Sequence, residues 1–306
     1  WIGTFHGLCH RILRAHAATI ELPGDFQILD AEDQKRAVKR VIQEAGVDDK
    51  AYDPRRVQWA INGFKEDALT AADVAARGDD DPQLVELYRR YQATLHRGGL
   101  VDFGDLLLRT LELFRKDPQV AAHYRERFRH VLVDEFQDTN RIQHLWLGEL
   151  LAEGDDFFAV GDDDQSIYGW RGARLDHVLD FQRHFPDARV VRLEQNYRST
   201  QPILTAANDV IRRNTGRMGK ELWTEKEVGQ PVAWMAAPTE RDEAQWVVRE
   251  IQRWVEGGRP RAEVAVLYRS HAQSRQFEEA LMGAGLPYRV YGGQRFFERA
   301  EIKDAL

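Results

Sequence analysis

The chain has 306 residues, of which 43% are hydrophobic and 30% are charged, and its formal net charge is −7. This length corresponds to roughly two domains of about 150 residues, and the composition is that of a globular chain. The single cysteine, Cys9, excludes an intramolecular disulfide framework and suits a reducing cytoplasm. No apolar run approaches the roughly 18 residues of a membrane span, so no membrane partner is expected.

The acidic excess is concentrated in one part of the chain. Residues 129–194 contain 14 acidic and 7 basic side chains, whereas the flanking segments are nearly balanced. Clustered carboxylates in this middle segment could hold a cation. The balanced segments leave room for a local basic groove, so the negative net charge does not exclude a nucleic-acid partner.

Helical signals dominate the first 128 residues. Thr4 is suited to cap a helix whose apolar residues recur at helical spacing. Asp30 precedes a second periodic segment, and two Asp-Pro pairs are typical of an N-cap followed by a proline at the first helical position. The helices expected after Thr4 cover 31–44, 54 onward, 84–97, 102–116 and 118–128.

Short apolar runs begin at Val131 and alternate with helical segments. Such runs are typical of strands that are buried on both faces, and the alternation implies parallel sheets with right-handed crossovers. In these sheets, chemistry gathers beyond the carboxyl ends of the strands. The expected strands are 131–133, 157–160, 190–193, 231–235, 264–268 and 288–291, and the helices between and after them are 141–151, 175–185, 201–214, 240–255 and 273–282.

Two adjacent carboxylates, Asp134 and Glu135, directly follow the first of these strands. Asp134 could hold Mg²⁺, because hard cations prefer carboxylate oxygens, and Glu135 could orient or deprotonate a water molecule. A solvated acidic turn is the simpler interpretation of two such residues alone. The polar stretch that follows them, Phe136–Asn140, favours a site.

The loop after the second strand, Gly161–Ala173, contains three consecutive aspartates followed by Gln165. The aspartates repel one another, so a cationic group is expected nearby. Gln165 could sense a terminal phosphate. Tyr168, Trp170 and Arg171 are planar groups that suit stacking on unpaired bases, although packing in the core competes as an interpretation for Tyr168.

The third strand leads into Tyr197 and Arg198. An arginine in this position could neutralise charge on a phosphoryl group during transfer, and a tyrosine beside it could stack on a nucleobase. Taken alone, each residue is better explained as part of the surface or of a helix cap.

Several long motifs resemble superfamily I DNA helicases of the UvrD/PcrA/Rep group. They occur in that family's order and span essentially the whole chain. The matching segments are TFHGLCHRILRAH, LVDEFQDTN, VGDDDQSIYGWRGA, LEQNYRST, YRSHAQSR and PYRVYGGQRFFERAEIKDAL.

This resemblance implies specific roles. Asp134 would ligate Mg²⁺, Glu135 would be the catalytic base, Gln165 would contact the γ-phosphate of ATP, Tyr197 would stack on adenine and Arg198 would be an arginine finger. The residues implied to contact single-stranded DNA are Thr4, Phe5, His6, Phe103, Tyr168, Trp170 and Arg171.

The implied fold is α/β, with two RecA-like parallel-sheet lobes of the P-loop NTPase type, both incomplete, and an all-helical insertion domain. The expected boundaries are 1–3 and 129–194 for the first lobe, 4–128 for the insertion, 195–291 for the second lobe and 292–306 for the start of another helical domain. Because the chain begins at Trp1 and ends within an expected helix, we expect an internal piece of a longer protein.

The implied function is an ATP-dependent 3′→5′ DNA helicase of repair or replication, which acts on single strands and single-strand/duplex junctions with repair proteins as partners. The 306 residues contain no G-x-x-x-x-G-K-[ST] motif, and Gly216–Glu221 has the wrong spacing. The chain alone is therefore expected to be inactive. Two alternatives stay open: the helicase subunit of a helicase–nuclease complex, and a non-catalytic DNA-binding scaffold.

Overall fold

The computed structural model describes residues 1–151, 156–226 and 229–291. The expected domain at 292–306 lies outside these residues. The helices are α1 (Phe5–His16), α2 (Ala31–Glu44), α3 (Pro54–Glu66), α4 (Ala71–Arg77), α5 (Pro82–Arg97), α6 (Phe103–Lys116), α7 (Pro118–Arg127), α8 (Arg141–Leu150), α9 (Asp176–Leu179), α10 (Phe181–His184), α11 (Gln201–Ile211), α12 (Glu240–Glu256) and α13 (Ser274–Gly283). The strands are β1 (Gln27–Ile28), β2 (Leu100–Val101), β3 (His130–Val133) and β4 (Asp156–Ala159).

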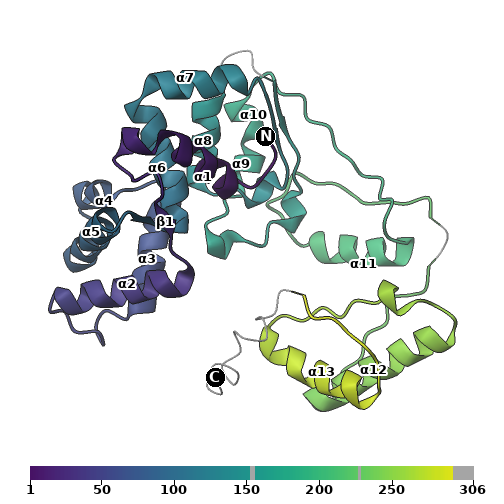
Figure 1. Ribbon diagram of the computed structural model, residues 1–306. Coiled ribbons are helices and arrows are strands. Elements are labelled where there is room, and N and C mark those ends of the chain that lie inside the picture. Colours follow the sequence, from purple (N-terminus) through teal and green to yellow (C-terminus); the bar gives the residue numbers. More distant parts are fainter. Residues whose placement is uncertain (152–155, 227–228, 292–306) are drawn as a thin grey trace. The chain divides into compact units, whose positions relative to one another are not determined.

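The described chain forms two compact units. The first contains residues 1–199 and 204–226, and the second contains residues 200–203 together with the chain from 227 onward. In the first unit α1 packs on α6, and α6 packs in turn on α7 and α8 (Figure 1). In the second unit α12 packs against α13.

Two separate hydrophobic cores stabilise the first unit. One joins α1, α6, α7 and α8 to β3 and includes the buried side chains of Ile12, Leu111 and Trp146. The other joins α2, α3, α4 and α5 around Ile42 and Tyr91. The first core therefore ties the N-terminal helices to the strand that carries the candidate carboxylates.

The expected starts of the N-terminal helices are confirmed. The Thr4 hydroxyl accepts a hydrogen bond from the backbone N–H of Gly7, and the Asp30 carboxylate accepts one from the N–H of Asp33. Asp53 and Asp81 likewise cap helices whose first residue is proline. These side chains satisfy N–H groups that have no partner within the helix.

The expected insertion is not entirely helical, which corrects the prediction. β1 and β2 pair in parallel, with Gln27 opposite Leu100 and Ile28 opposite Val101. The two strands form backbone hydrogen bonds because the chain, after forming α2–α5, returns to lie beside β1. A two-residue pair has too little periodicity to be read from the sequence.

One expected parallel pair forms. β3 and β4 run side by side, with Val131 opposite Phe157 and Val133 opposite Ala159. The expectation that both faces are buried is wrong for this pair, because Leu132 and Phe158 are exposed.

Four other expected strands are not assigned within the described residues, at 190–193, 231–235, 264–268 and 288–291. Their apolar side chains are largely exposed, as at Trp234 and Leu267. Apolar and β-branched residues favour an extended backbone, but a strand also needs a neighbour that completes its hydrogen bonds. The parallel sheet expected for the second lobe is therefore not formed in the part of the chain described.

The expected helix at 175–185 is also interrupted. The backbone of Asp180 leaves the helical region (φ −95°, ψ 13°), so the segment forms two short helices, α9 and α10.

Candidate functional site

Asp134 and Glu135 lie directly beyond the carboxyl end of β3, where the sequence placed them. Glu135 has φ 52° and ψ 43°, a left-handed conformation that few residues other than glycine adopt. Its N–H donates to the Asp134 carboxylate at 2.9 Å. This turn leaves both carboxylates exposed, so that a ligand can reach them.

Gln137 joins the ends of the two parallel strands, a role that sequence reasoning missed. Its Nε2 donates to the Glu135 carboxylate at 2.7 Å, and its Oε1 accepts from the backbone N–H of Asp162 at 2.9 Å. The Gln137 side chain is buried. A Cβ on Gly161 would lie 2.9 Å from Gln137 Oε1, so glycine permits this close approach. The side-chain amide of Gln137 therefore links Glu135, the candidate catalytic base after β3, to the loop that follows β4.

Asp138 adds a third carboxylate near Glu135. Its buried Oδ1 has no hydrogen-bond partner among the described residues. Burial, together with the charge of Glu135, raises the pKa of Asp138. Carboxylate oxygens are the ligands that Mg²⁺ prefers. Asp138 lines the same cavity as Asp134 and Glu135, but among the described residues the carboxylates that gather closely enough to share a cation are Asp162, Asp163 and Asp164.

A cavity of about 790 Å³ opens beside β3. It is lined by Thr4, Phe5 and His6 at the start of α1 and by Asp134 and Glu135, together with other residues. The structure therefore brings three expected DNA-contacting residues to the same cavity as the expected nucleotide-site carboxylates. Burial lowers the pKa of His6, so its ring is more readily neutral than a solvated histidine.

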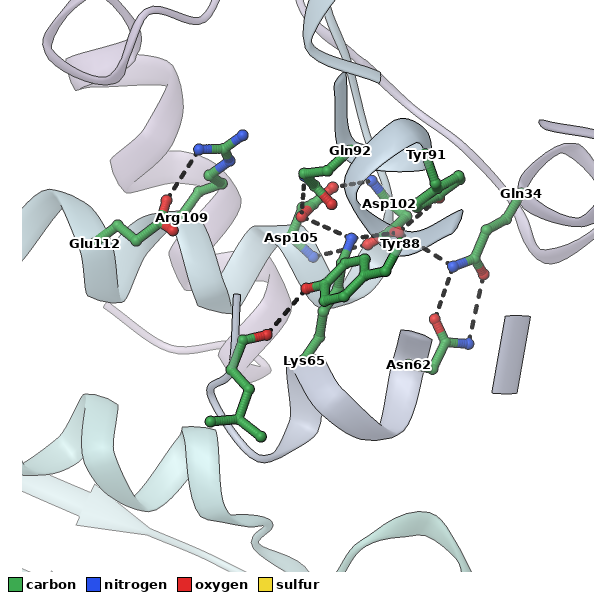
Figure 2. Close-up of polar contacts among 11 residues, drawn as sticks. Gln34, Asn62, Lys65, Tyr88, Tyr91, Gln92, Asp102, Asp105, Arg109 and Glu112 are labelled. Carbon is green, nitrogen blue, oxygen red and sulfur yellow. Dashed lines mark hydrogen bonds and ion pairs between the residues drawn. The ribbon is translucent and has the colours of Figure 1, made fainter. Parts of the chain in front are cut away.

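Phe103, the first residue of α6, lies edge-on to His6 with ring centroids 5.9 Å apart. Just over half of its surface is exposed. It is held by a buried polar network (Figure 2) in which Lys65 Nζ donates to Asp102 at 2.7 Å and to Asp105 at 2.8 Å. Tyr91 also donates to Asp102. Because Asp102 and Asp105 form the capping box of α6, the network fixes the helix end that presents Phe103.

Tyr168, Trp170 and Arg171 form one exposed cluster. The Arg171 guanidinium lies 4.5 Å from the Trp170 ring centroid and 5.5 Å from that of Tyr168. Trp170 is 70% exposed and Tyr168 is 38% exposed, so neither ring is packed in the core. Gly172 has φ 75°, and a Cβ there would lie 2.7 Å from the Glu66 carboxylate, so the turn that ends this cluster requires glycine.

The positive charge expected near the three aspartates comes from two side chains of a later segment. Arg217 donates to both oxygens of Asp164, at 2.7 and 2.6 Å, and Lys220 pairs with Asp162. The backbone N–H of Met218 donates to Asp163 at 2.6 Å. The aspartates are therefore satisfied by the protein itself.

Tyr197 and Arg198 form a different part of the first unit. The Tyr197 hydroxyl donates to Gln195 at 2.8 Å, and the backbone N–H of Arg198 donates to Asn196 at 2.9 Å. Both side chains are exposed. The structure gives neither of them a hydrogen bond or ion pair with Asp134, Glu135 or Gln165 in the residues it describes.

Among the residues that the structure describes, none of the helices combines the length and the apolar character that a membrane span needs.

Residues 1–186 match the family model of the UvrD/REP helicase N-terminal domain, and residues 191–306 match that of the UvrD-like helicase C-terminal domain.

Curated relatives align over the whole chain. DNA helicase II of Escherichia coli (strain K12) and that of Salmonella typhimurium are each 52% identical over 307 residues. The ATP-dependent DNA helicase PcrA of Staphylococcus aureus (strain Mu50) is 42% identical over 308 residues. The chain spans 43% of the length of the two DNA helicases II and 42% of that of PcrA. With both family models matched in succession, the chain belongs to the UvrD/REP helicase family.

Proposed function

We propose that this chain is part of an ATP-dependent DNA helicase that moves 3′→5′ on single-stranded DNA and separates strands at single-strand/duplex junctions. The observation that carries the proposal is the junction at the ends of β3 and β4. There Gln137 contacts both Glu135 and the backbone of Asp162. A catalytic base and a phosphate-sensing loop must be held in fixed relation for hydrolysis to be coupled to loop movement.

In this proposal Asp134 holds Mg²⁺ with ATP, and Glu135 activates the attacking water. Gln165 contacts the γ-phosphate, Tyr197 stacks on adenine and Arg198 acts as the arginine finger. Mg²⁺ would neutralise phosphate charge, while the chain's own residues orient the water and hold the loop. The proposed cellular role is DNA repair or replication in the cytoplasm, with repair proteins as partners.

The proposed DNA path joins two groups of side chains. Thr4, Phe5, His6 and Phe103 form one group, and the cluster of Tyr168, Trp170 and Arg171 forms the other. Exposed rings beside a guanidinium suit stacking on successive unpaired bases without sequence preference. Strand movement would follow from loop movement, because Gln165 and Trp170 belong to one continuous loop.

The substitution Glu135→Gln in the full-length protein tests the catalytic assignment. It keeps the size of the side chain and removes its capacity to accept a proton, so ATP hydrolysis should be abolished while ATP and single-strand binding are retained. Phosphate release and nucleotide binding are measured side by side. Unwinding of a tailed duplex by this variant would remove Glu135 from the proposed role. The absence of DNA-stimulated hydrolysis in the unsubstituted full-length protein would refute the function itself.

A further inference from the structure

The segment 216–221 has no role in the assignments above, yet it contacts the candidate phosphate-sensing loop. Arg217 binds Asp164 through two parallel hydrogen bonds, and its Nη2 also donates to the carbonyl of Lys220 at 2.8 Å. Gly219, with φ 76°, turns the chain between them. This closed turn directs both cationic side chains toward the same three aspartates.

The ion pairs of this turn are shielded from water. The side chains of Arg217, Lys220 and Asp164 are each less than one-fifth exposed, and that of Asp162 is less than one-quarter exposed. Charge pairs in such surroundings are screened less by salt than pairs on an open surface. The bidentate geometry of Arg217 on Asp164 also fixes direction as well as distance. The turn therefore restricts the position of the loop more than a surface ion pair would.

Asp162 passes this restraint on to Gln165. One of its carboxylate oxygens receives Lys220, and the other accepts a hydrogen bond from Gln165 Nε2 at 2.7 Å. Burial acts to raise the pKa of Asp162, but the hydrogen bonds from Lys220 and Gln165 outweigh it, and the pKa is lowered. Asp162 is therefore a charged acceptor that orients the Gln165 amide. Through its own N–H it also contacts Gln137, which holds Glu135.

We propose that Arg217 and Lys220 are positioning residues of the ATPase site. They act through Asp164 and Asp162, and they hold Gln165 and its loop in a fixed position relative to Glu135. The inference rests on the proposed function. It explains why three adjacent carboxylates are tolerated in this loop, because each receives a donor from one turn. Neither residue touches the nucleotide in this scheme, so the effect of each is on the chemical step.

The test uses the full-length helicase with single-stranded DNA, Mg²⁺ and ATP. Lys220→Met should lower kcat for ATP hydrolysis by roughly ten- to a hundredfold, since misplacing a catalytic group by about 1 Å costs up to that factor, and should leave KM within about threefold. Lys220→Arg, which retains the charge, should recover most of kcat. Arg183→Gln is the matched control, because it breaks an exposed ion pair with Asp180 outside the site.

A double-mutant cycle extends the test to Arg217. Arg217→Gln and Asp164→Asn should each lower kcat, and together they should lower it by less than the product of the single effects, because the pair acts as a unit. Fully multiplicative effects overturn the pairing.

An unchanged kcat in Lys220→Met overturns the positioning role. An equal loss in Lys220→Met and Lys220→Arg, accompanied by a lower melting temperature in both, overturns it in favour of a structural role. A wild-type protein that does not hydrolyse ATP overturns the proposed function instead, so the two failures are distinguishable.

Discussion

Trp170 and Trp59 are equally exposed, at 70% and 71%, but their surroundings differ. The Trp170 ring has the Arg171 guanidinium over it and Tyr168 beside it, whereas no such ring or cation contact is found for Trp59 within the described residues. An exposed ring alone is common on protein surfaces. A ring in a cationic aromatic cluster is well suited to stacking on an unpaired base.

Trp170→Ala should therefore weaken binding of a single-stranded oligonucleotide by about 1–3 kcal/mol, the usual contribution of one stacked base. Trp59→Ala, which removes the same ring from α3, serves as the control and should change the affinity little. Fluorescence anisotropy of a labelled oligonucleotide gives both values. Equal affinities for the Trp170→Ala variant and the wild type would exclude Trp170 from the DNA path.

The residues of the proposed site differ in how clearly the sequence marks them. Asp134, Glu135 and Gln165 stand out because they follow apolar runs within long motifs. Gln137 is not marked by the sequence, since one amide among polar neighbours gives no signal until a second strand lies beside it. Lys220 stands in the sequence within a wrongly spaced phosphate-loop pattern, and its pairing with Asp162 joins residues far apart in sequence.

At the scale of helices and strands, the sequence predicts features that depend on neighbouring residues better than features that depend on distant ones. Helix starts were predictable because capping is decided within four residues, as at Thr4 and Asp30. Strands depend on a distant partner. The run at 157–160 contains β4, which pairs with β3, whereas the equally apolar run at 190–193 has no strand assigned. An apolar run therefore indicates extended backbone, not pairing.

The end of α3, the middle of α5 and the start of α6 meet at a buried charge network, which leads to a prediction about stability. Lys65 is completely buried between Asp102 and Asp105. Burial and the neighbouring Asp102 raise the pKa of Asp105. Lys65→Met would leave two carboxylates without their counter-charge.

Lys65→Met should therefore lower the free energy of unfolding by about 3–5 kcal/mol, the usual effect of breaking a buried pair. Lys35→Met is the control: Lys35 pairs with Glu32 at 3.7 Å near the surface, and its loss should cost less than about 1 kcal/mol. Urea unfolding measures both. Similar losses in the two variants would show that the buried network contributes no more than a surface pair.

The contact of α8 with α9 predicts a dependence of stability on pH. His144 on α8 stacks on His177 on α9, with ring centroids 4.3 Å apart, and His177 Nδ1 lies 3.3 Å from the Thr139 hydroxyl. Burial, followed by the neighbouring His144, lowers the pKa of His177 to about 4, although Asp176 acts in the opposite direction. His184 lies edge-on to His144.

Because the pKa of His177 is lower in the folded state than the ordinary histidine value of 6.5, the unfolded chain binds more protons between these two values. The free energy of unfolding should fall by about 1–2 kcal/mol from pH 7 to pH 5 through this group. His177→Gln should flatten the slope. Urea midpoints at several pH values measure it, and identical slopes in variant and wild type would contradict the assignment.

At the scale of the whole molecule, the acidic middle segment is not a general repulsive surface. Its densest carboxylates receive donors from the segment 217–220, which lies in a part of the chain with balanced charge. The net charge of the chain therefore says little about its binding partners, because donors from 217–220 compensate the acidic excess where the carboxylates are densest. The expected division into lobes at residue 195 stays a prediction.

As a separate protein, the 306-residue chain is expected not to hydrolyse ATP. The residues proposed for water activation and phosphate sensing are present, but the sequence contains no G-x-x-x-x-G-K-[ST] motif. Affinity for a nucleotide's phosphates comes chiefly from the backbone N–H groups and the lysine of that motif. The purified chain should therefore bind ATP weakly and release no phosphate above background, with or without single-stranded DNA.

The full-length protein is the positive control, and its Glu135→Gln variant sets the background of the assay. The two controls separate loss of the phosphate cradle from loss of the catalytic base, since only the first also removes ATP binding. If the chain alone hydrolyses ATP at a rate near that of the full-length protein, the phosphates are held by residues in these 306 positions. The cavity beside β3, lined by Thr4 and Glu135, would then be the first place to look for them.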